Sequence, residues 1–235
     1  MSASGSRLDG QVALVTGASR GIGQAIALEL ADAGADLVLC STRAHGCEQV
    51  VREVMARKRR AIGLAADVAS PADCDRLVAA ALEVFGRVDC LVNNAGLVRR
   101  APVQGTSDAD FDRVLAVNLH GPFYLARRVL PGMLERGSGR IVNVSSISSR
   151  MGSPRMVPYC ASKWGLNGLT QALAAELKGR GVTVTAVLPG SVDTEMLKGS
   201  GLPPAMTARE VASVVRYLVA EAPEAMNGSL VEMFG

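Results

Sequence analysis

Short apolar runs alternate with amphipathic segments along the whole chain. Each run is almost continuously apolar and is bounded by Gly, Pro or polar residues, which is typical of strands buried on both faces of a parallel sheet. The segments between the runs carry apolar residues at helical spacing. The expected strands are residues 11–16, 36–41, 61–67, 88–93, 140–146, 182–188 and 230–234.

Local signals mark the ends of the helices between these strands. Ser70 followed by Pro71 begins a helix that runs to Phe85, and Thr207 with Glu210 forms a capping box for the last helix. The other expected helices are residues 22–33, 46–58, a region that begins at Ser107, and about 156–178.

The order of these elements predicts the fold. Strands that alternate with helices form parallel sheets through right-handed crossovers. We therefore expect an α/β protein with a single doubly wound domain over residues 1–235, in which about seven parallel strands carry helices on both faces. Pro122 and Pro131 should bend or interrupt the long helical region that Ser107 begins.

A glycine-rich turn joins the first strand to the first helix. It runs from Thr16 to Gly23 and includes Gly17 and Gly21. Glycines at this place let the backbone turn tightly and let a diphosphate approach the free amides at the helix start. Their position between a strand and a helix is more specific than the glycines alone, and it indicates a dinucleotide site.

The end of the second strand indicates which dinucleotide binds. A site for NAD would place an acid there to bind the ribose 2′-hydroxyl. This chain has Ser41, Thr42 and Arg43 instead, and Arg20 lies in the glycine turn. Two guanidinium groups and two hydroxyls suit a 2′-phosphate, so we expect NADP(H).

Tyr159 and Lys163 are candidates for proton transfer. Four residues apart on a helix, their side chains share one face, with Cβ atoms about 5–6 Å apart. An ammonium group beside a phenol favours the phenolate and would lower a pKa that starts near 10. Tyr159 could then exchange a proton at neutral pH. Ser146 ends the apolar strand just upstream, where its hydroxyl could hold a carbonyl or alkoxide oxygen.

Composition argues against several other classes of protein. The chain has 235 residues, a net charge of +3 and five scattered cysteines without a metal or disulfide spacing. We therefore expect no metal site, no nucleic-acid partner and a reducing compartment. The chain start does not resemble a signal peptide, and no run approaches the ~18 apolar residues of a membrane span. The expected placement is cytoplasmic, without a membrane partner.

These motifs together make the chain resemble the classical short-chain dehydrogenase/reductase family over nearly its whole length. The glycine turn matches the family's Thr-Gly-x-x-x-Gly-x-Gly motif. The further motifs fall on Asn93-Asn94-Ala95-Gly96, Asn118, Ser146, the Tyr-x-x-x-Lys of Tyr159 and Lys163, Pro189-Gly190 and Thr194. The resemblance implies a Rossmann-type fold and an oxidoreductase acting on alcohols and carbonyls.

The resemblance implies a catalytic role for four residues. Tyr159 would protonate a carbonyl oxygen as hydride arrives from the nicotinamide, and Ser146 would orient that oxygen. Lys163 would hold the nicotinamide ribose hydroxyls, and Asn118 would kink its helix and hold a water that passes protons to Lys163. Ser145 is an alternative to Ser146, and only the spacing of thirteen residues to Tyr159 favours Ser146.

The resemblance also assigns the cofactor site. Asp67 would accept a hydrogen bond from the adenine amino group and Val68 would line the adenine, while Val192 and Thr194 would touch the nicotinamide and its amide. The residues implied to contact NADP(H) are Gly17, Ser19, Arg20, Gly21, Ile22, Gly23, Ser41, Thr42, Arg43, Asp67, Val68, Asn94, Ala95, Gly96, Tyr159, Lys163, Pro189, Gly190, Val192 and Thr194.

The resemblance leaves the substrate open. The chain is most similar to 3-oxoacyl-acyl-carrier-protein reductases, which implies an acyl-thioester or other small carbonyl substrate and an acidic carrier protein. Arg99, Arg100, Arg127 and Arg128 would either meet such a partner or be solvated surface charges. General carbonyl, quinone, sugar and steroid dehydrogenases of the family are alternatives, and so is a non-catalytic NADP sensor or scaffold.

Two departures from the family pattern affect the substrate side. Ser149 and Arg150 fill a loop in which family members often have glycine three residues after the catalytic serine. The segment after Thr194 is shorter than usual, so residues 195–206 would form a short lid. A short lid should leave the substrate cleft more open.

The resemblance also implies a homotetramer or a dimer. Family members commonly pair through the helices that correspond here to residues 110–134 and 156–178. Leu166, Leu169 and Leu173 either face outward and permit this pairing or face the sheet.

Overall fold

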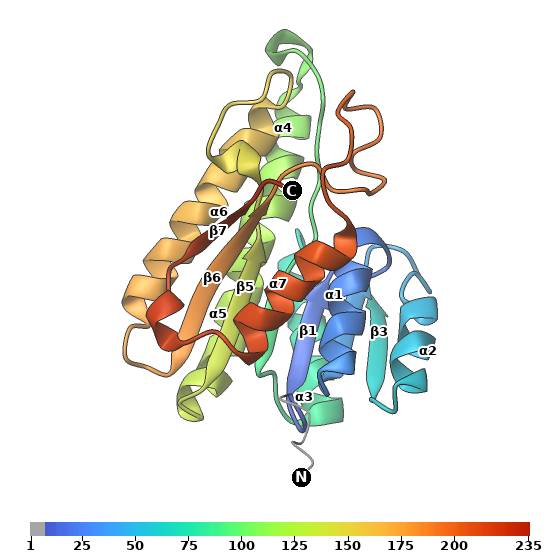
Figure 1. Ribbon diagram of the computed structural model, residues 1–235, viewed down its shortest axis with the longest axis vertical. Coiled ribbons are helices and arrows are strands. Elements are labelled where there is room, and N and C mark those ends of the chain that lie inside the picture. Colours follow the sequence, from blue (N-terminus) through green and yellow to red (C-terminus); the bar gives the residue numbers. More distant parts are fainter. Residues whose placement is uncertain (1–7) are drawn as a thin grey trace.

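Seven strands lie side by side in one parallel sheet in this computed structural model, which describes residues 8–235 (Figure 1). The strands are β1 (Val12–Thr16), β2 (Asp36–Ser41), β3 (Ala61–Ala65), β4 (Cys90–Asn93), β5 (Gly139–Val144), β6 (Val182–Pro189) and β7 (Leu230–Met233). Their order across the sheet is β3-β2-β1-β4-β5-β6-β7, and every neighbouring pair is parallel.

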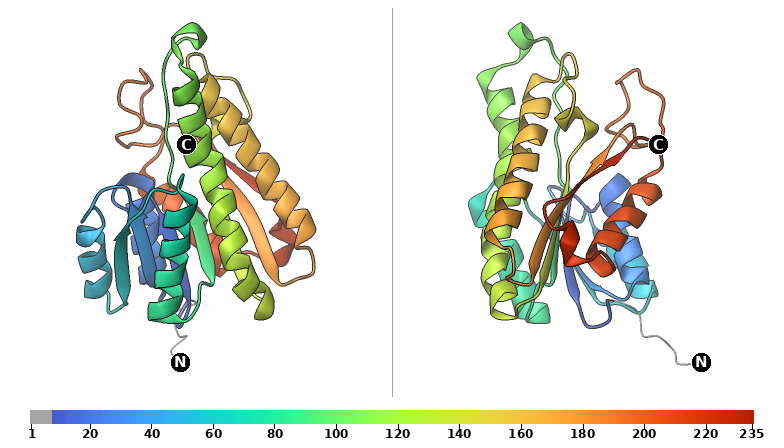
Figure 2. Two further views of the ribbon diagram at one scale, coloured as in Figure 1. Left: turned by 180° about the vertical axis from the view of Figure 1, so that it is seen from behind. Right: turned by 60° about the vertical axis from the view of Figure 1, so that its left-hand side comes forward.

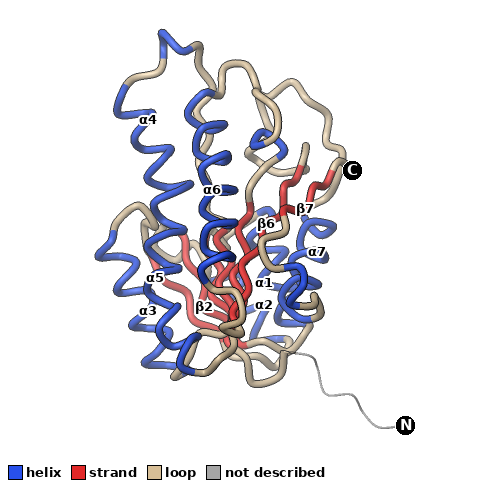
Figure 3. Tube along the Cα trace, turned by 90° about the vertical axis from the view of Figure 1, so that its left-hand side faces the viewer, coloured by secondary structure: helices blue, strands red, loops and turns tan. Residues whose placement is uncertain are grey.

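Helices cover both faces of this sheet (Figure 3). They are α1 (Gly21–Asp32), α2 (Glu48–Ala56), α3 (Pro71–Phe85), α4 (Asp108–Leu115), α5 (Gly121–Glu135), α6 (Val157–Glu176) and α7 (Ala208–Ala220). On one face α1 packs between α2 and α7, and on the other α3 packs on α5 and α4 on α6. The predicted doubly wound fold is confirmed.

The burial of β1 explains why the strands appear in the sequence as continuous apolar runs. Ala13 and Val15 belong to the core under α1, α2 and α7, whereas Val12 and Leu14 belong to the core under α3, α5 and α6. Successive side chains of a strand point to opposite faces of the sheet. A strand covered on both faces must therefore be apolar at every position, not at alternate ones.

The direction in which the chain crosses the sheet reverses at β1. The chain moves from β1 to β2 and β3, then returns to β4 on the other side of β1 and continues to β7. The connections after β1 and β4 therefore diverge at the carboxyl ends of these strands and open a crevice there. The glycine turn after β1 lies at this crevice, as expected from the sequence.

Ser107 caps the long helical region. This region is interrupted, but not at the two prolines where the sequence predicted it. A π-helical segment, residues 116–120, separates α4 from α5. Pro122 lies in the first turn of α5, where a missing amide costs little. Pro131 lies inside α5 without ending it, so the interruption expected there is wrong. A proline removes one helical hydrogen bond, which a helix packed along a sheet can tolerate.

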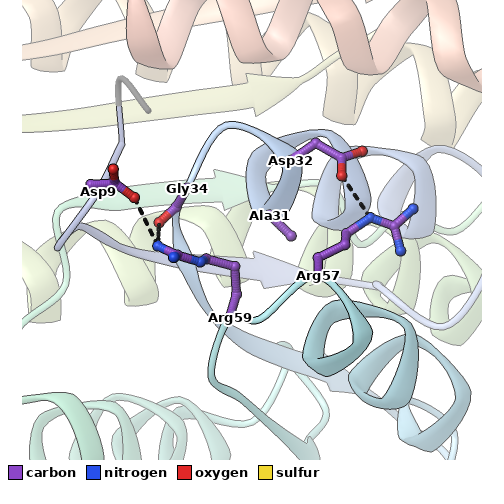
Figure 4. Close-up of a pocket in the computed structure, with 6 residues that line it drawn as sticks. All are labelled: Asp9, Ala31, Asp32, Gly34, Arg57 and Arg59. Atoms are coloured by element: carbon purple, nitrogen blue, oxygen red, sulfur yellow. Dashed lines mark hydrogen bonds and ion pairs between the residues drawn. The ribbon is translucent and has the colours of Figure 1, made fainter. Parts of the chain in front are cut away.

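The opposite end of the sheet carries a shallow hollow beside the basic run Arg57–Arg60 (Figure 4). The two arginines that line the hollow are paired with aspartates. Arg57 Nε lies 2.8 Å from Asp32 Oδ1, and Arg59 Nη1 lies 2.8 Å from Asp9 Oδ1. Arg60 Nε also lies 2.8 Å from Asp36 Oδ2, so each of the three arginines of the run is paired with an aspartate. None of the helices within residues 8–235 combines the length and apolar character that crossing a bilayer would need.

Candidate active site

The glycine turn forms the floor of the crevice and leaves no room for a side chain at its last glycine. Gly17 and Gly21 have φ values of +63° and +57°, which side chains disfavour. A Cβ atom on Gly23 would lie 2.2 Å from the carbonyl oxygen of Gly17. The residue that precedes α1, Arg20, makes no capping hydrogen bond with its side chain. The first amides of α1 are therefore available to an anion.

Asn94 supports this turn from β4. Its Nδ2 donates to the carbonyl oxygens of Thr16 at 2.9 Å and Gly17 at 3.1 Å. The hydroxyl of Thr16 accepts from the amides of Asn94 and Ala95, each at 3.0 Å. The sequence indicated Asn94 and Ala95 as cofactor contacts. The structure places the side chain of Asn94 beneath the turn, where it fixes the conformation that a diphosphate would meet.

The chain leaves β2 through Ser41, Thr42 and Arg43, a stretch that has a cationic side chain and no acidic one. Ser41 is buried and its hydroxyl donates to the carbonyl of Arg43, whereas Thr42 and Arg43 are exposed. Within residues 8–235, the guanidinium groups of Arg20 and Arg43 make no hydrogen bond or ion pair. The charge of Arg20 contributes to lowering the pKa of Glu195, after the larger effect of Lys198. Both arginines are thus free to meet an anionic ligand at the edge of the crevice.

The side chains of the segment after β3 make contacts within the protein that the sequence did not indicate. Asp67 accepts from the amide of Ala69 at 3.0 Å, and its other oxygen lies 2.9 Å from Nη1 of Arg113 on α4. The side chain of Val68 packs against Gly121, where an added Cβ would lie 2.9 Å from it. Asp67 therefore lies at the crevice with part of its hydrogen-bonding capacity already used. Val68 packs between the crevice and the start of α5.

Tyr159 and Lys163 lie on the face of α6 that is turned toward β5. Both are buried, with exposed fractions of 9% and 3%. The ammonium nitrogen of Lys163 donates to the carbonyl oxygen of Val144 at 2.7 Å and lies 5.7 Å from the centre of the Tyr159 ring. The hydroxyl of Ser146 lies near enough to the Tyr159 phenol to lower its pKa. These three residues are therefore brought together as the sequence predicted.

The charge balance at Tyr159 differs from the expectation. Burial raises the pKa of Tyr159, and the nearby hydroxyl of Ser146 offsets part of this rise. Burial also lowers the pKa of Lys163 to about 8. The ammonium nitrogen of Lys163 is directed to the carbonyl of Val144, and burial is the largest influence on the pKa of Tyr159. At neutral pH Tyr159 is therefore a protonated phenol, which is the form that can donate a proton.

Ser145 and Ser146 have separate partners. Ser145 Oγ lies 3.3 Å from the carbonyl oxygen of Lys163 and is directed into the protein. Ser146 faces Tyr159, and its hydroxyl also accepts from the amide of Ser148 at 3.1 Å. The geometry therefore favours Ser146 as the hydroxyl beside Tyr159.

Asn118 joins the two sides of the crevice from within the π-helical segment. It is fully buried, and its side-chain amide pairs with both backbone groups of Leu97, each at 2.8 Å. Its Nδ2 also lies 3.0 Å from the hydroxyl of Ser162 on α6. A Cβ placed on Gly96 would lie 3.7 Å from Asn118 Oδ1 and 3.8 Å from Lys163 Nζ. Gly96, Asn118 and Lys163 therefore adjoin one another.

The segment after β6 closes over the glycine turn. Residues Pro189 and Gly190 end the strand, and Val192 pairs with Met206 in a short parallel bridge. The methyl group of Thr194 would lie 3.3 Å from a Cβ on Gly21, so Thr194 lies directly above the turn. Residues 195–206 contain no helix.

The family of this chain follows from its similarity to known proteins. A model of the short chain dehydrogenase family matches residues 11–203. The chain belongs to this family. It is 39% identical to a 3-oxoacyl-[acyl-carrier-protein] reductase of Synechocystis, over 91% of each chain. It is also 39% identical to a D-threitol dehydrogenase of Mycolicibacterium smegmatis, over 95% of this chain and 91% of the relative.

A solved structure of this dehydrogenase family shows the same architecture. The crystal structure of levodione reductase superposes with a TM-score of 0.91 at 31% identity, and the match covers 97% of both chains. The family therefore extends over both the crevice and the segment that closes it, and it implies a nicotinamide cofactor.

Three of the four arginines considered for a carrier protein have intramolecular partners in this dehydrogenase. Arg99 lies 3.2 Å from Asp110, and Arg128 is paired with Asp75. Arg100 donates to the carbonyl oxygen of Met196 at 2.8 Å and so ties the loop after β4 to the segment 195–206. The guanidinium of Arg127 lies 5.5 Å from the ring centre of Phe123.

Other residues of the site carried no motif in the sequence. Arg113 pairs with Asp67, and Asn167 binds Ser149 on the far side of the Ser146 backbone. Asn167 lies eight residues after Tyr159 on the same helix, so helical periodicity could have placed it near the same face. No periodicity could have paired Arg113 with Asp67, because the two lie on separate elements. Within the described residues no group of three His, Cys, Asp or Glu side chains is arranged to hold a metal ion.

Replacing Gly23 tests the turn. Gly23→Ala would place a methyl group 2.2 Å from Gly17 O and 2.4 Å from Asn94 Nδ2. The turn must then shift, and we expect the Kd for NADPH and for NADH to rise by about tenfold or more, or about 1.4 kcal/mol. Quenching or enhancement of the nucleotide fluorescence measures this. Gly168→Ala on α6, where the added Cβ meets nothing within 4 Å, is the control and should bind normally. Unchanged binding by a folded Gly23→Ala protein would contradict this account of the turn.

Proposed function

We propose that this protein is an NADPH-dependent reductase that transfers hydride to a ketone or aldehyde carbonyl and, in reverse, oxidises the alcohol. The observation that carries the proposal is the cluster of Ser146, Tyr159, Lys163 and Asn118 at the carboxyl edge of the sheet, beside a glycine turn with free helix amides. A sensor or scaffold would need only the turn, and it would not need a buried phenol beside a serine hydroxyl.

Tyr159 acts as the proton donor in the proposed reduction. Burial keeps its phenol protonated at neutral pH. The hydroxyl of Ser146 is the second group that a carbonyl oxygen would meet, and a hydrogen bond from it stabilises the negative charge that develops on that oxygen. In the oxidation direction Tyr159 accepts the alcohol proton, and a neighbouring positive charge would make it a better base.

Lys163 and Asn118 form the back of the proposed site. With a pKa of about 8, Lys163 is mostly protonated at neutral pH and can donate to ribose hydroxyls. Asn118 holds Leu97 and Ser162 and thereby fixes the distance between the loop after β4 and α6. Asn118 would also hold the water that passes protons to Lys163.

NADP(H) fits the residues that line the crevice. The diphosphate would lie on the turn from Gly17 to Gly23, and the 2′-phosphate would meet Arg20 and Arg43, whose guanidinium groups make no hydrogen bond or ion pair within residues 8–235. When bound, the reduced nicotinamide supplies the hydride. Asp67 would accept from the adenine amino group with the capacity that Arg113 leaves free. Thr194, above the turn, would contact the nicotinamide amide.

A 3-oxoacyl thioester is the substrate class that we propose first. It is supported by the relative that is named a 3-oxoacyl-[acyl-carrier-protein] reductase. The segment 195–206 contains no helix, and as a short lid it would leave the substrate side open to a long acyl or pantetheine chain. A polyol is the alternative, because a relative of equal identity is named D-threitol dehydrogenase. An acidic carrier protein would meet Arg127, the arginine of the four that has no hydrogen bond or ion pair within residues 8–235.

The outer surface of α5 and α6 supports assembly into a tetramer or dimer. The long helical region of α4 and α5 lies beside α6 (Figure 2). Phe123 and Trp164 expose 41% and 52% of their surface there, whereas Leu166 is buried and faces the protein interior. Of the two orientations that the sequence left open, Leu166 therefore has the one that faces the sheet, and the two aromatic residues are the exposed apolar side chains on this surface. The five cysteines are unpaired, in keeping with a cytoplasmic placement.

Turnover across a substrate panel tests the proposed reaction. We expect NADPH oxidation with acetoacetyl thioester, and a fall in kcat of about 10²–10⁴-fold in Tyr159→Phe, because the proton donor is lost. Tyr217→Phe is the matched control, since Tyr217 lies on α7 and its hydroxyl contacts Met226. Threitol oxidation without thioester reduction would favour the polyol alternative. The absence of turnover with every carbonyl and alcohol of the panel would favour a sensor.

Cofactor preference tests the two arginines. Arg43→Ala removes a charge-assisted contact, so we expect KM for NADPH to rise about tenfold, while KM for NADH stays the same. Arg180→Ala removes an exposed arginine elsewhere and is the control. A wild-type enzyme that used NADH more efficiently than NADPH, or an Arg43→Ala enzyme that lost both cofactors equally, would argue against a 2′-phosphate site.

Sedimentation tests the interface. Phe123→Asp places a charge on the outer face of α5 and should lower the measured mass, because an unpaired charge opposes burial in an interface. Met55→Asp on α2 is the control, since Met55 is an exposed apolar residue on the other face of the sheet. A wild-type protein that sediments as a monomer would rule out the assembly.

A further inference from the structure

A set of polar contacts joins β5 and the turn that follows it to one face of α6. Asn143 donates to the hydroxyl of Thr170 at 2.9 Å, and Lys163 donates to the carbonyl of Val144. Nearer the carboxyl edge, Asn167 donates to Ser149, and the Ser146 hydroxyl lies near the Tyr159 phenol and lowers its pKa. We call these four contacts the β5–α6 polar ladder. Its last contact forms the proposed catalytic pair, and the Asn167–Ser149 contact lies next to that pair through the backbone of Ser146.

The Asn167–Ser149 contact reaches the backbone of Ser146. The hydroxyl of Ser149 donates to the carbonyl oxygen of Ser146, and the amide of Ser149 donates to the same oxygen at 2.9 Å. Asn167 Nδ2 donates to Ser149 Oγ at 2.7 Å. Ser149 has an exposed fraction of 0% and Asn167 one of 5%. Water therefore cannot replace either contact.

The direction of these hydrogen bonds is fixed by proton count. The hydroxyl of Ser149 has one proton, and it goes to the carbonyl of Ser146, which can only accept. Asn167 must therefore present its NH₂ group to Ser149. This leaves the Oδ1 atom of Asn167 buried and without a hydrogen-bond partner among the described residues.

Since Asn167 Oδ1 has no partner among the described residues, the side-chain bond to Ser149 is what the amide of Asn167 provides. An apolar side chain of the same size would avoid the cost of burying this oxygen. What the amide gains is the shorter of two donated bonds to Ser149 Oγ, 2.7 Å from Asn167 Nδ2 against 3.4 Å from Ser145 Oγ. Because both partners are enclosed, that shorter bond holds the carbonyl of Ser146 in one orientation, with the Ser146 backbone extended at φ −167° and ψ 155°.

We propose that Ser149 and Asn167 are positioning residues for the reduction: Asn167 fixes the Ser149 hydroxyl, which binds the carbonyl of Ser146 and so directs the Ser146 hydroxyl at Tyr159 and the substrate oxygen. The proposal rests on the proposed function, since it assigns these two residues to the same site. Neither side chain touches substrate or cofactor. Both act through Ser146.

The position of Tyr159 and Ser146 on different elements makes such a device necessary. Tyr159 is carried by α6, whereas Ser146 lies in the turn after β5. Keeping their hydroxyls close requires the turn and the helix to keep their spacing to within a fraction of an ångström. Asn167 lies on α6 and Ser149 lies in the turn, so their contact ties the two carriers together.

Variants of the two residues test the proposal by turnover. Asn167→Leu removes the donor at nearly constant volume, and Ser149→Ala removes the hydroxyl. We expect each to lower kcat about tenfold to hundredfold without changing KM for NADPH, because misplacement of a catalytic group reduces the rate of the chemical step. The double variant should lose no more than either single variant, since both break one chain of contacts. Additive losses, or an unchanged kcat in both folded single variants, would overturn the proposal.

A titration of Tyr159 tests the proposal without any turnover. The chain has three tyrosines, so the phenolate absorbance of each protein minus that of its Tyr159→Phe counterpart isolates Tyr159. The hydroxyl of Ser146 lowers the pKa of Tyr159. Loosening Ser146 should therefore move the midpoint of this titration to higher pH in Asn167→Leu and in Ser149→Ala. An unchanged midpoint in the folded variants would overturn the positioning role even if the substrate of the enzyme were never found.

Thr170→Val is the matched control. Thr170 lies one turn further along α6, is fully buried and bonds Asn143 and the carbonyl of Leu166. Its loss should lower the thermal midpoint, because it leaves Asn143 with an unpaired group. It should leave the Tyr159 titration unchanged. A shift of that titration in Thr170→Val as large as in Asn167→Leu would show that any damage to the ladder suffices, and would overturn a specific role for Asn167. If Asn167→Leu does not fold, Ser149→Ala decides the question.

Discussion

The contact between α6 and β5 is the constraint on which the candidate site depends. Tyr159 and Lys163 are carried by a helix, and Ser146 by the turn after a strand, so no local rule of chain geometry fixes their distance. The β5–α6 polar ladder fixes it, through contacts that are almost entirely removed from water. Buried hydrogen bonds are costly to leave unmade, which makes such a set of contacts more specific about spacing than an apolar interface of equal area.

Burial sets the protonation of the two titratable side chains in this region. Enclosing Tyr159 raises its pKa and keeps the phenol protonated, and enclosing Lys163 lowers its pKa to about 8. The same desolvation disfavours the charged form of each group. The site thus holds a neutral acid beside an ammonium group that remains mostly charged at neutral pH. Asn118 closes the far side by binding both backbone groups of Leu97.

The two halves of the crevice are built differently. The side proposed for the cofactor consists of backbone, glycines and the two free arginines, held from below by Asn94. The side proposed for the substrate consists of the turn after β5 and the segment 195–206, which Arg100 ties to the loop after β4. A turn that leaves no room for side chains suits a ligand that is the same in all relatives. A short segment without a helix suits substrates that differ in length from one relative to another. This division agrees with relatives that share a fold and act on different substrates.

The sequence by itself determined the layers, the glycine turn and the pairing of Tyr159 with Lys163. These follow from local rules: continuous apolar runs mark strands covered on both faces, a glycine has no Cβ, and residues four apart share a helix face. The tertiary structure alone decided that Ser145 is directed to the carbonyl of Lys163, that Lys163 is directed to Val144, and that Arg113 meets Asp67. Each of these joins residues on separate elements, and their distances arise only when the helices pack on the sheet.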